Sequence, residues 1–267
     1  MTPLTGDVAR IEQRLVTARR LWLFLDYDGT LDDFAPTPDD VLPNPEVIAV
    51  LRALQANPAL RVTLLSGRRL AHIEKLAPVP GLMLAGTYGI EIRLPDGERV
   101  ERVPHAQIRP TLEALKPRWA ALIADHEGFY LEDKGWALAL HGRFADDAVA
   151  EAVFATARAQ LEALDLAHFR MLGGHKFLEL GARLAHKGRA IEHLLAAQPL
   201  PGALLLYLGD DDKDEEAFAV VQAHGGLAVV VAGPERESCA DGRLPSPQAA
   251  RAWLMTLAEL NPPPPGA

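Results

Sequence analysis

Apolar residues gather in short continuous runs that alternate along the chain with helical patterns. Five of these runs have the length of buried strands, and they cover residues 21–26, 61–67, 82–89, 203–210 and 227–233. Apolar positions with helical spacing fall between or beside them, over residues 45–57, 68–77, 187–197 and 214–226. Strands that are apolar throughout and alternate with helices predict an α/β fold, in which helices cover both faces of a parallel sheet.

Residues 91–100 and the stretch from 105 to 184 depart from this alternation. The segment EIRLPDGERV (91–100) contains an Asp-Gly turn signal, which predicts a hairpin at an edge of the sheet. Within the longer stretch, the pattern predicts a helix over 105–128 that is disturbed at Pro110 and Pro117, and then two short strands over 129–143 around Asp133–Gly135. A second helix is predicted over 145–164, capped by Asp146 or Asp147. A strand pair over 169–182 follows, with its turn at Gly173 and Gly174.

Paired strands with helices indicate a small α+β module inserted into the α/β core. We therefore expect residues 1–104 and 185–267 to form the core and residues 105–184 to form the inserted domain. The tail NPPPPGA (261–267) lacks apolar periodicity and is predicted to be disordered.

Composition narrows the class of protein. The 267 residues are 49% hydrophobic and carry a net charge of −9, which argues against a nucleic-acid partner because such binders need a basic face. No apolar stretch is long enough for a signal peptide or a membrane span, and Cys239 is the only cysteine. We expect a cytoplasmic protein with no membrane partner, and nothing in the sequence requires more than a monomer.

Polar side chains follow several of the predicted strands. They are Asp26, Asp28, Ser66, Asp210 and Asp211, and Lys187 lies at a predicted helix start. In open parallel sheets, ligands bind beyond the carboxyl ends of the strands, so these groups are expected to meet at one crevice. Mg²⁺ prefers hard oxygen ligands, usually one or two carboxylates with a substrate phosphate oxygen. The pattern therefore indicates a Mg²⁺–phosphate site.

Each of these signals also has an ordinary structural interpretation. An Asp-x-Asp pair at a strand end is usually a turn or a helix cap, and Ser66-Gly67 is more often a plain loop. The acidic run from Asp210 to Glu215 fits a solvated helix N-terminus, where acidic residues favour the macrodipole. The functional interpretation is favoured because all the groups occur in order, each at a predicted strand end or helix start.

Four motifs then resemble those of haloacid dehalogenase-like (HAD) phosphohydrolases. They are DYDGT (26–30), the serine of LLSGR, the lysine of AHKG and GDDDKDE (209–215). The segments LFLDYDGTLDDF, EIRLPDG, LEDKGWALALH and HKFLELGARLAHKG are similar to trehalose-6-phosphate phosphatases. The resemblance implies a Rossmann-like HAD core with a smaller α+β cap domain. It also implies Mg²⁺-dependent hydrolysis of a sugar phosphate, trehalose 6-phosphate, to trehalose and inorganic phosphate.

The resemblance assigns roles in the reaction. Asp26 would be the nucleophile that forms an aspartyl-phosphate, and Asp28 would be the general acid and base. Ser66 and Lys187 would hold the phosphoryl oxygens, while the neighbouring Gly67 and Arg68 are expected to bind substrate.

The metal ligands implied by the resemblance are Asp26, the backbone carbonyl of Asp28, and Asp210. Either Asp211 or Asp214 would complete the metal shell or orient Lys187, and the sequence leaves both alternatives open.

In the cap, the resemblance maps sugar-binding residues onto Glu132, Lys134 and Glu179. Without the resemblance, these three would be taken as solvated residues on strand faces. His141 and His175 lie near the same predicted strands and are weaker candidates to face the sugar.

Three positions depart from the family's pattern. Tyr88 stands in Gly-Thr-Tyr-Gly where the family has Gly-x-His-Gly, Gly142 stands where it has the tyrosine of His-Tyr-Arg, and Lys213 stands where it has threonine. These departures leave the identity of the sugar undecided, so a sucrose-phosphate or glycosyl-phosphoglycerate phosphatase is an alternative. A non-catalytic sugar-phosphate sensor is a further alternative, although a sensor needs neither the nucleophile Asp26 nor the acid Asp28.

Overall fold

The computed structural model describes residues 4–34, 41–162 and 164–260. The chain divides into two compact units: one runs to Val100 and resumes at His186, and the other spans Glu101–Ala185. The sequence predicted these divisions at 104/105 and 184/185. The predicted disorder of residues 261–267 concerns residues outside the described part of the chain.

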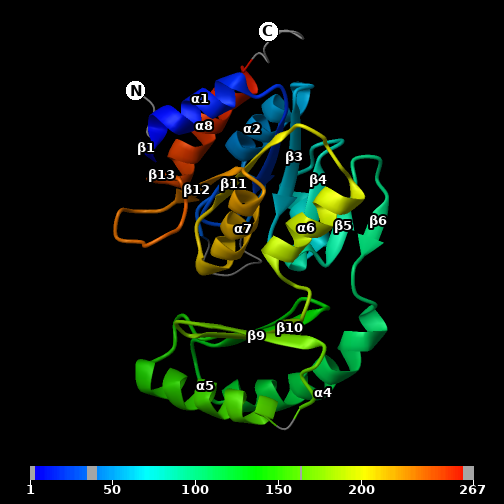
Figure 1. The fold of residues 1–267 in the computed structure, drawn as a ribbon. Helices are drawn as coiled ribbons and strands as arrows, with labels where there is room; N and C mark the ends of the chain where they lie inside the picture. Colours follow the sequence, from blue (N-terminus) through cyan, green and yellow to red (C-terminus); the bar gives the residue numbers. More distant parts are fainter. Residues whose placement is uncertain (1–3, 35–40, 163, 261–267) are drawn as a thin grey trace. The chain divides into compact units, whose positions relative to one another are not determined.

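A nine-stranded sheet forms the first unit (Figure 1). Its order is β1 (Thr5–Gly6), β13 (Gly242–Leu244), β12 (Leu227–Val231), β11 (Leu204–Gly209), β2 (Leu21–Leu25), β3 (Leu60–Leu65), β4 (Met83–Gly86), β5 (Glu91–Arg93) and β6 (Arg99–Glu101). The six strands from β13 to β4 pair in parallel, whereas β1 and β5 pair antiparallel to their neighbours. The predicted parallel core sheet and its edge hairpin are confirmed.

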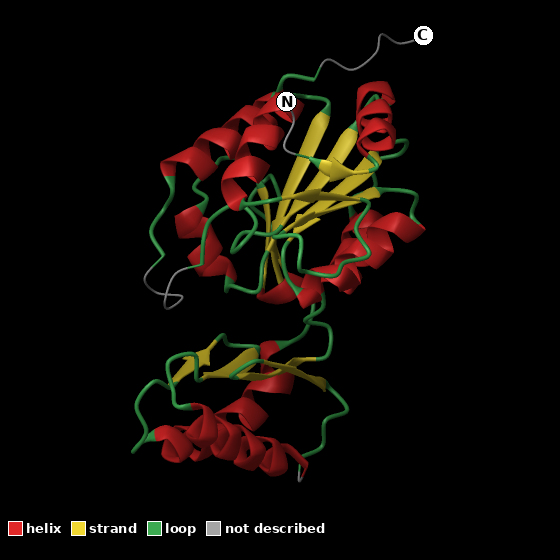
Figure 2. Cartoon of the chain, turned by 90° about the vertical axis from the view of Figure 1, so that its left-hand side faces the viewer, coloured by secondary structure: helices red, strands yellow, loops and turns green. Residues whose placement is uncertain are grey.

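Helices cover both faces of this sheet (Figures 1 and 2). One face packs on α1 (Val8–Thr17), α2 (Pro45–Ala56), α3 (Leu70–Leu76) and α8 (Pro247–Ala258), and the other packs on α6 (Lys187–Ala197) and α7 (Asp212–Ala223). Strand β2 shows the cause: Leu23 belongs to the first core and Phe24 to the second, and both are fully buried. No helix in the described residues is both long and apolar enough to span a bilayer.

The second unit is a four-stranded antiparallel sheet with two helices on one face (Figure 2). The strand order is β7 (Tyr130–Asp133), β8 (Ala137–His141), β10 (Phe177–Ala182) and β9 (Phe169–Gly174), and the helices are α4 (His105–Ile123) and α5 (Asp147–Glu162). Helix α4 continues through Pro110 and Pro117, so the predicted disturbance does not break it. Asp146 rather than Asp147 caps α5, because its carboxylate accepts from the amides of Ala148 and Val149.

One predicted turn is wrong. Gly173 and Gly174 lie inside β9, and the chain turns at His175 and Lys176, where Lys176 has a φ of 52°. Within the strand, Gly173 lies beside the guanidinium of Arg158, which is 2.8 Å from the position of a Cβ there.

Candidate active site

The polar residues predicted to meet do follow adjacent strands of the core sheet. Asp26 follows β2, Ser66 follows β3 and Asp210 follows β11, and these three strands are neighbours in the order β11-β2-β3. The amide of Asp26 donates to the carbonyl of Leu208 at 3.0 Å, which continues the β2–β11 pairing to the sheet edge. The parallel topology therefore places these side chains at one carboxyl edge, as the sequence predicted.

Asp26 and Lys187 form a buried ion pair at this edge. The Lys187 Nζ lies 2.9 Å from Asp26 Oδ1, and the two residues are only 2% and 5% exposed. Burial raises the pKa of Asp26 well above its usual range. Burial alone would lower the pKa of Lys187, but the neighbouring carboxylates of Asp214 and Asp26 raise it well above its usual range. The lysine is therefore held as a cation beside the predicted nucleophile.

Asp214 orients Lys187. Its Oδ1 accepts from Lys187 Nζ at 2.5 Å and from the Tyr207 hydroxyl at 2.6 Å. Its Oδ2 accepts from the amides of Asp210 and Asp211, each at 3.0 Å. These four bonds satisfy the acceptor sites of a carboxylate. Of the two alternatives left by the sequence, Asp214 is the residue that contacts Lys187.

Asp211 has a different task at the start of α7. Its carboxylate accepts from the Lys213 amide and from Lys213 Nζ, both at 2.8 Å, and it forms a capping box with Asp214. These bonds close the first turn of the helix that carries Asp214.

Asp26, Asp210 and Asp214 are close enough to hold a cation together. One carboxylate oxygen of each lies within 4.8 Å of the others. Burial, with Asp214 and Asp211 adding repulsion, raises the pKa of Asp210 to about 7. Because the oxygens of Asp214 are fully used, Asp26 and Asp210 are the carboxylates with acceptor sites left for a metal. Crowded, buried hard oxygens of this kind fit Mg²⁺.

Gly29 allows Asp210 to come this close. It has a φ of 76°, and a Cβ at this position would lie 2.3 Å from Asp210 Oδ2. The Thr30 hydroxyl then donates to Asp210 Oδ1 at 3.0 Å. The residues that follow Asp28 in the motif therefore position a carboxylate from the other half of the core.

Asp28 and Arg68, which the sequence assigned to separate roles, bind each other. Arg68 Nε and Nη2 donate to the two carboxylate oxygens of Asp28 at 2.6 and 2.7 Å. Such a bidentate pair fixes both groups in one plane. The Arg68 amide also donates to the Ser66 hydroxyl at 3.1 Å, and Ser66 is 1% exposed. Sequence reasoning found all three residues but missed this pairing.

In the second unit, Glu132, Lys134 and Glu179 come together on one face of the sheet. Glu132 on β7 and Glu179 on β10 both lie opposite Ala139 of β8, so their side chains share a face. Lys134 Nζ lies 2.7 Å from Glu179 Oε2 and 3.7 Å from Glu132 Oε2. Glu179 is fully buried, and its Oε1 has no hydrogen-bond partner among the described residues. An acceptor left in this state is suited to a ligand hydroxyl.

His141 extends this cluster. Its Nε2 lies 3.1 Å from Glu132 Oε2, and its ring stacks on Tyr130 with the centroids 4.2 Å apart. Phe177 closes the other side at 5.2 Å. The sequence named His141 only as a weak candidate, although the two-residue spacing of Tyr130 from Glu132 could have revealed this row. His175 lies exposed in the β9–β10 turn.

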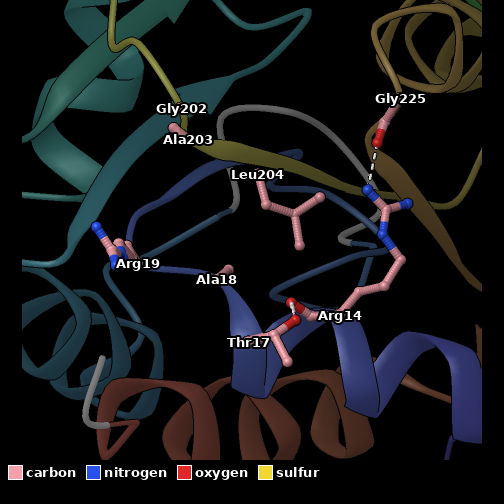
Figure 3. Close-up of a pocket in the computed structure, with 8 residues that line it drawn as sticks. All are labelled: Arg14, Thr17, Ala18, Arg19, Gly202, Ala203, Leu204 and Gly225. Atoms are coloured by element: carbon pink, nitrogen blue, oxygen red, sulfur yellow. Dashed lines mark hydrogen bonds between the residues drawn. The ribbon is translucent and has the colours of Figure 1, made fainter. Parts of the chain in front are cut away.

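A pocket of about 480 Å³ lies at the opposite end of the core sheet, beside the start of β11 (Figure 3). Arg14 lines it and donates to the carbonyls of Gly225 and Gly226, just beyond the end of α7. Arg14 therefore ties α1 to the loop that follows α7, which is a structural role.

Comparison with known proteins links this site to a family. The family described as Trehalose-phosphatase matches residues 24–248. A probable trehalose-phosphate phosphatase of Sinorhizobium fredii is 35% identical over 248 residues, covering 90% of this chain and 88% of the relative. A trehalose-phosphate phosphatase of Mycobacterium bovis is 34% identical over 221 residues, which cover 80% of this chain and 55% of the longer mycobacterial protein.

The fold also matches a solved structure. The C-terminal domain of the C. albicans trehalose-6-phosphate phosphatase has a TM-score of 0.82 and 20% identity, and the match covers 95% of this chain and 97% of that one. At this identity the likeness shows the fold alone. The predicted Rossmann-like HAD core with a smaller α+β unit is thereby confirmed.

Proposed function

Because the chain belongs to the trehalose-phosphatase family, we propose that it hydrolyses trehalose 6-phosphate to trehalose and inorganic phosphate. The observation that carries the proposal is the buried Asp26–Lys187 pair beside Asp210 at the sheet edge. Together these three residues combine a nucleophile, a fixed cation and a second carboxylate in one place.

In the first step, a carboxylate oxygen of Asp26 attacks phosphorus and the bond from phosphorus to the sugar oxygen breaks. Asp28 gives a proton to the leaving sugar oxygen. In the second step, water attacks the aspartyl-phosphate, Asp28 takes a proton from this water, and the bond from phosphorus to Asp26 breaks. Dividing one displacement into two easier steps is the general advantage of covalent catalysis.

Arg68 controls when Asp28 is available. The bidentate pair engages both carboxylate oxygens of Asp28. For Asp28 to carry a proton, this pair must open as substrate binds. Positioned acid–base groups of this kind typically contribute about 10²–10⁴-fold.

Asp26, Asp210 and the backbone carbonyl of Asp28 would hold a Mg²⁺ ion. When bound, the ion supplies positive charge that offsets repulsion between the phosphoryl oxygens and the nucleophile. Ser66 and Lys187 donate to the phosphoryl oxygens, and Asp214 keeps the lysine aimed at them.

The second unit would act as the cap that binds the sugar. Carboxylates accept strongly from hydroxyls, so Glu132 and the open Oε1 of Glu179 suit sugar hydroxyl groups. Lys134 balances their charge from between them. Binding energy from a remote sugar ring contributes to catalysis when it fixes the phosphate in place.

The test is phosphate release from trehalose 6-phosphate by the purified chain with Mg²⁺, with and without EDTA. We expect turnover that EDTA abolishes and added Mg²⁺ restores, and Asp26→Asn is expected to reduce turnover to background. Sucrose 6-phosphate, a glucosyl-phosphoglycerate and glucose 6-phosphate are run beside it. Faster turnover of one of these compounds would make it the preferred substrate in place of trehalose 6-phosphate. Near-wild-type activity of Asp26→Asn would exclude the covalent mechanism.

A further inference from the structure

Three consecutive residues after β4 adopt the left-handed conformation. Thr87, Tyr88 and Gly89 have φ values of 49°, 54° and 85°. Glycine adopts this conformation freely, but threonine and tyrosine do so at a cost in energy. Backbone strain of this kind persists only where the surroundings hold it, and it concentrates at functional sites.

The turn is held by the segment that carries Ser66 and Arg68. The Tyr88 amide donates to the Ser66 carbonyl at 2.8 Å, and the Thr87 amide donates to the Arg68 carbonyl at 2.7 Å. Glu91 adds a side-chain link, because its Oε2 accepts from the Thr87 hydroxyl at 3.2 Å and from the Leu70 amide at 3.3 Å.

Two glycines allow the turn and this segment to interlock. A Cβ on Gly67 would lie 2.7 Å from the ring of Tyr88, so the aromatic ring lies directly over the Gly67 backbone. A Cβ on Gly86 would lie 2.3 Å from the Leu70 nitrogen. Both approaches are closer than any side chain permits, which explains glycine at these two positions.

The turn also packs against α6, the helix that begins with Lys187. Tyr88 is 6% exposed and Thr87 is fully buried. Tyr88 also interacts electrostatically with Lys213: burial would lower the pKa of that lysine, and Tyr88 and Asp211 together raise it. The turn therefore touches the elements that carry Ser66 and Lys187.

We propose that Tyr88 is a positioning residue for phosphoryl transfer, with its ring over Gly67 fixing the Ser66–Arg68 segment against α6. The proposal rests on the proposed function, because Ser66 and the Arg68–Asp28 pair matter only if this site transfers phosphate. It adds a residue outside the set proposed above to hold the phosphate and the metal. The side chains explain the strained backbone: Thr87 is needed for its bond to Glu91, and Tyr88 is needed for its ring.

A double-mutant cycle tests this. Tyr88→Ala removes the ring, and Gly67→Ala pushes a methyl group into it. Each variant is expected to lower kcat by at least about tenfold, because small misplacements at a reacting centre cost up to about 10²-fold. Because the ring and the methyl group collide, the double variant should be no slower than Tyr88→Ala alone. Tyr88→Phe keeps the ring and should retain activity within about threefold of the wild type, as expected when packing is preserved.

Kinetics on two substrates separate positioning from loss of structure. All variants are measured below their melting temperatures on trehalose 6-phosphate and on p-nitrophenyl phosphate. We expect kcat to fall equally on both, with KM for the sugar phosphate little changed. Lys176→Ala, which truncates a side chain at another left-handed position (φ 52°) in the second unit, is the matched control and should keep wild-type kcat.

Several results would overturn the proposal: wild-type kcat in Tyr88→Ala, a loss in Tyr88→Phe as large as in Tyr88→Ala, or losses that multiply in the double variant. Multiplied losses would mean that Gly67 acts on substrate directly rather than through Tyr88. A wild-type protein that releases no phosphate would instead refute the proposed function, so the two failures are distinguishable.

Discussion

Tyr207 and Tyr27 offer a matched test of how the buried acidic cluster is stabilised. Both side chains are fully buried. The Tyr207 hydroxyl donates to Asp214 at 2.6 Å, whereas the Tyr27 hydroxyl has no hydrogen-bond partner among the described residues. Replacing each tyrosine by phenylalanine removes one oxygen and leaves the packing of the ring in place.

The expected effects have opposite directions. Tyr207→Phe removes a hydrogen bond to a charged group, which is worth about 1.5–3 kcal/mol of unfolding free energy. At about 2–4 °C for each kcal/mol, the melting temperature should fall by roughly 3–12 °C. Tyr27→Phe removes a buried hydroxyl without a partner, so the unfolding free energy should stay the same or rise by about 1 kcal/mol.

Urea unfolding followed by circular dichroism measures both variants, and the slope m is compared with that of the wild type. Activity gives a second readout. In Tyr207→Phe, Lys187 keeps its contacts to Asp214 and Asp26. We therefore expect kcat to fall by less than about tenfold, which corresponds to the loss of one hydrogen bond. If Tyr27→Phe destabilises the protein as much as Tyr207→Phe, then the bond to Asp214 is not the source of the effect.

Four further substitutions test other parts of the protein. Glu132→Ala and His141→Ala should lower kcat/KM for trehalose 6-phosphate by about 10–100-fold and leave turnover of p-nitrophenyl phosphate unchanged; equal losses on both substrates would exclude a sugar-binding role. Gly29→Ala places a methyl group 2.3 Å from a carboxylate oxygen of Asp210, at a residue whose φ is 76°. The Mg²⁺ concentration needed for half-maximal activity should therefore rise. An unchanged metal titration would contradict the proposed metal site. Hydrogen bonds from Arg109 hold the pKa of Asp133 below its ordinary value of 3.8. The stability that this pair contributes is therefore present above about pH 4 and is lost as the pH falls further. In Asp133→Asn this pH-dependent contribution should be absent, which a titration of the melting temperature into acid would show.

The sequence predicted the core because its strands are buried on both faces. In β2 all five residues are buried, so the run of apolar letters alone marks the strand. The outer elements were missed for the opposite reason. Strands β1 and β13 are two and three residues long and include Gly6 and Gly242, so backbone pairing rather than an apolar pattern defines them.

Helices α1 and α8 were missed although each carries a start signal. Asp7 caps α1, and Val8, Ile11 and Leu15 follow at helical spacing, so the pattern of this helix was also present in the sequence. Ser246 and Pro247 form a regular start for α8. That signal was present in the sequence and could have been used.

At the site, topology predicted positions but not bonds. Asp26, Ser66 and Asp210 could be placed because each follows a strand of a parallel sheet. The pairing of Asp28 with Arg68 depends on how two loops orient their side chains, and no spacing encodes it. The choice of Asp214 over Asp211 as the partner of Lys187 required side-chain directions within one helical turn.

The three departures from the family's pattern are each compensated by local contacts. At Gly142, a Cβ would lie 2.8 Å from the ring of Phe129 and 3.1 Å from that of Phe154, so these phenylalanines fill the space that a tyrosine side chain would need. Lys213 adds a positive charge, and Asp211 pairs with it at 2.8 Å. Tyr88 fills the space over Gly67. None of the three departures is a member of the Asp26–Lys187 pair or of the Lys134–Glu179 pair, so both ion pairs of the proposed site are present in this chain.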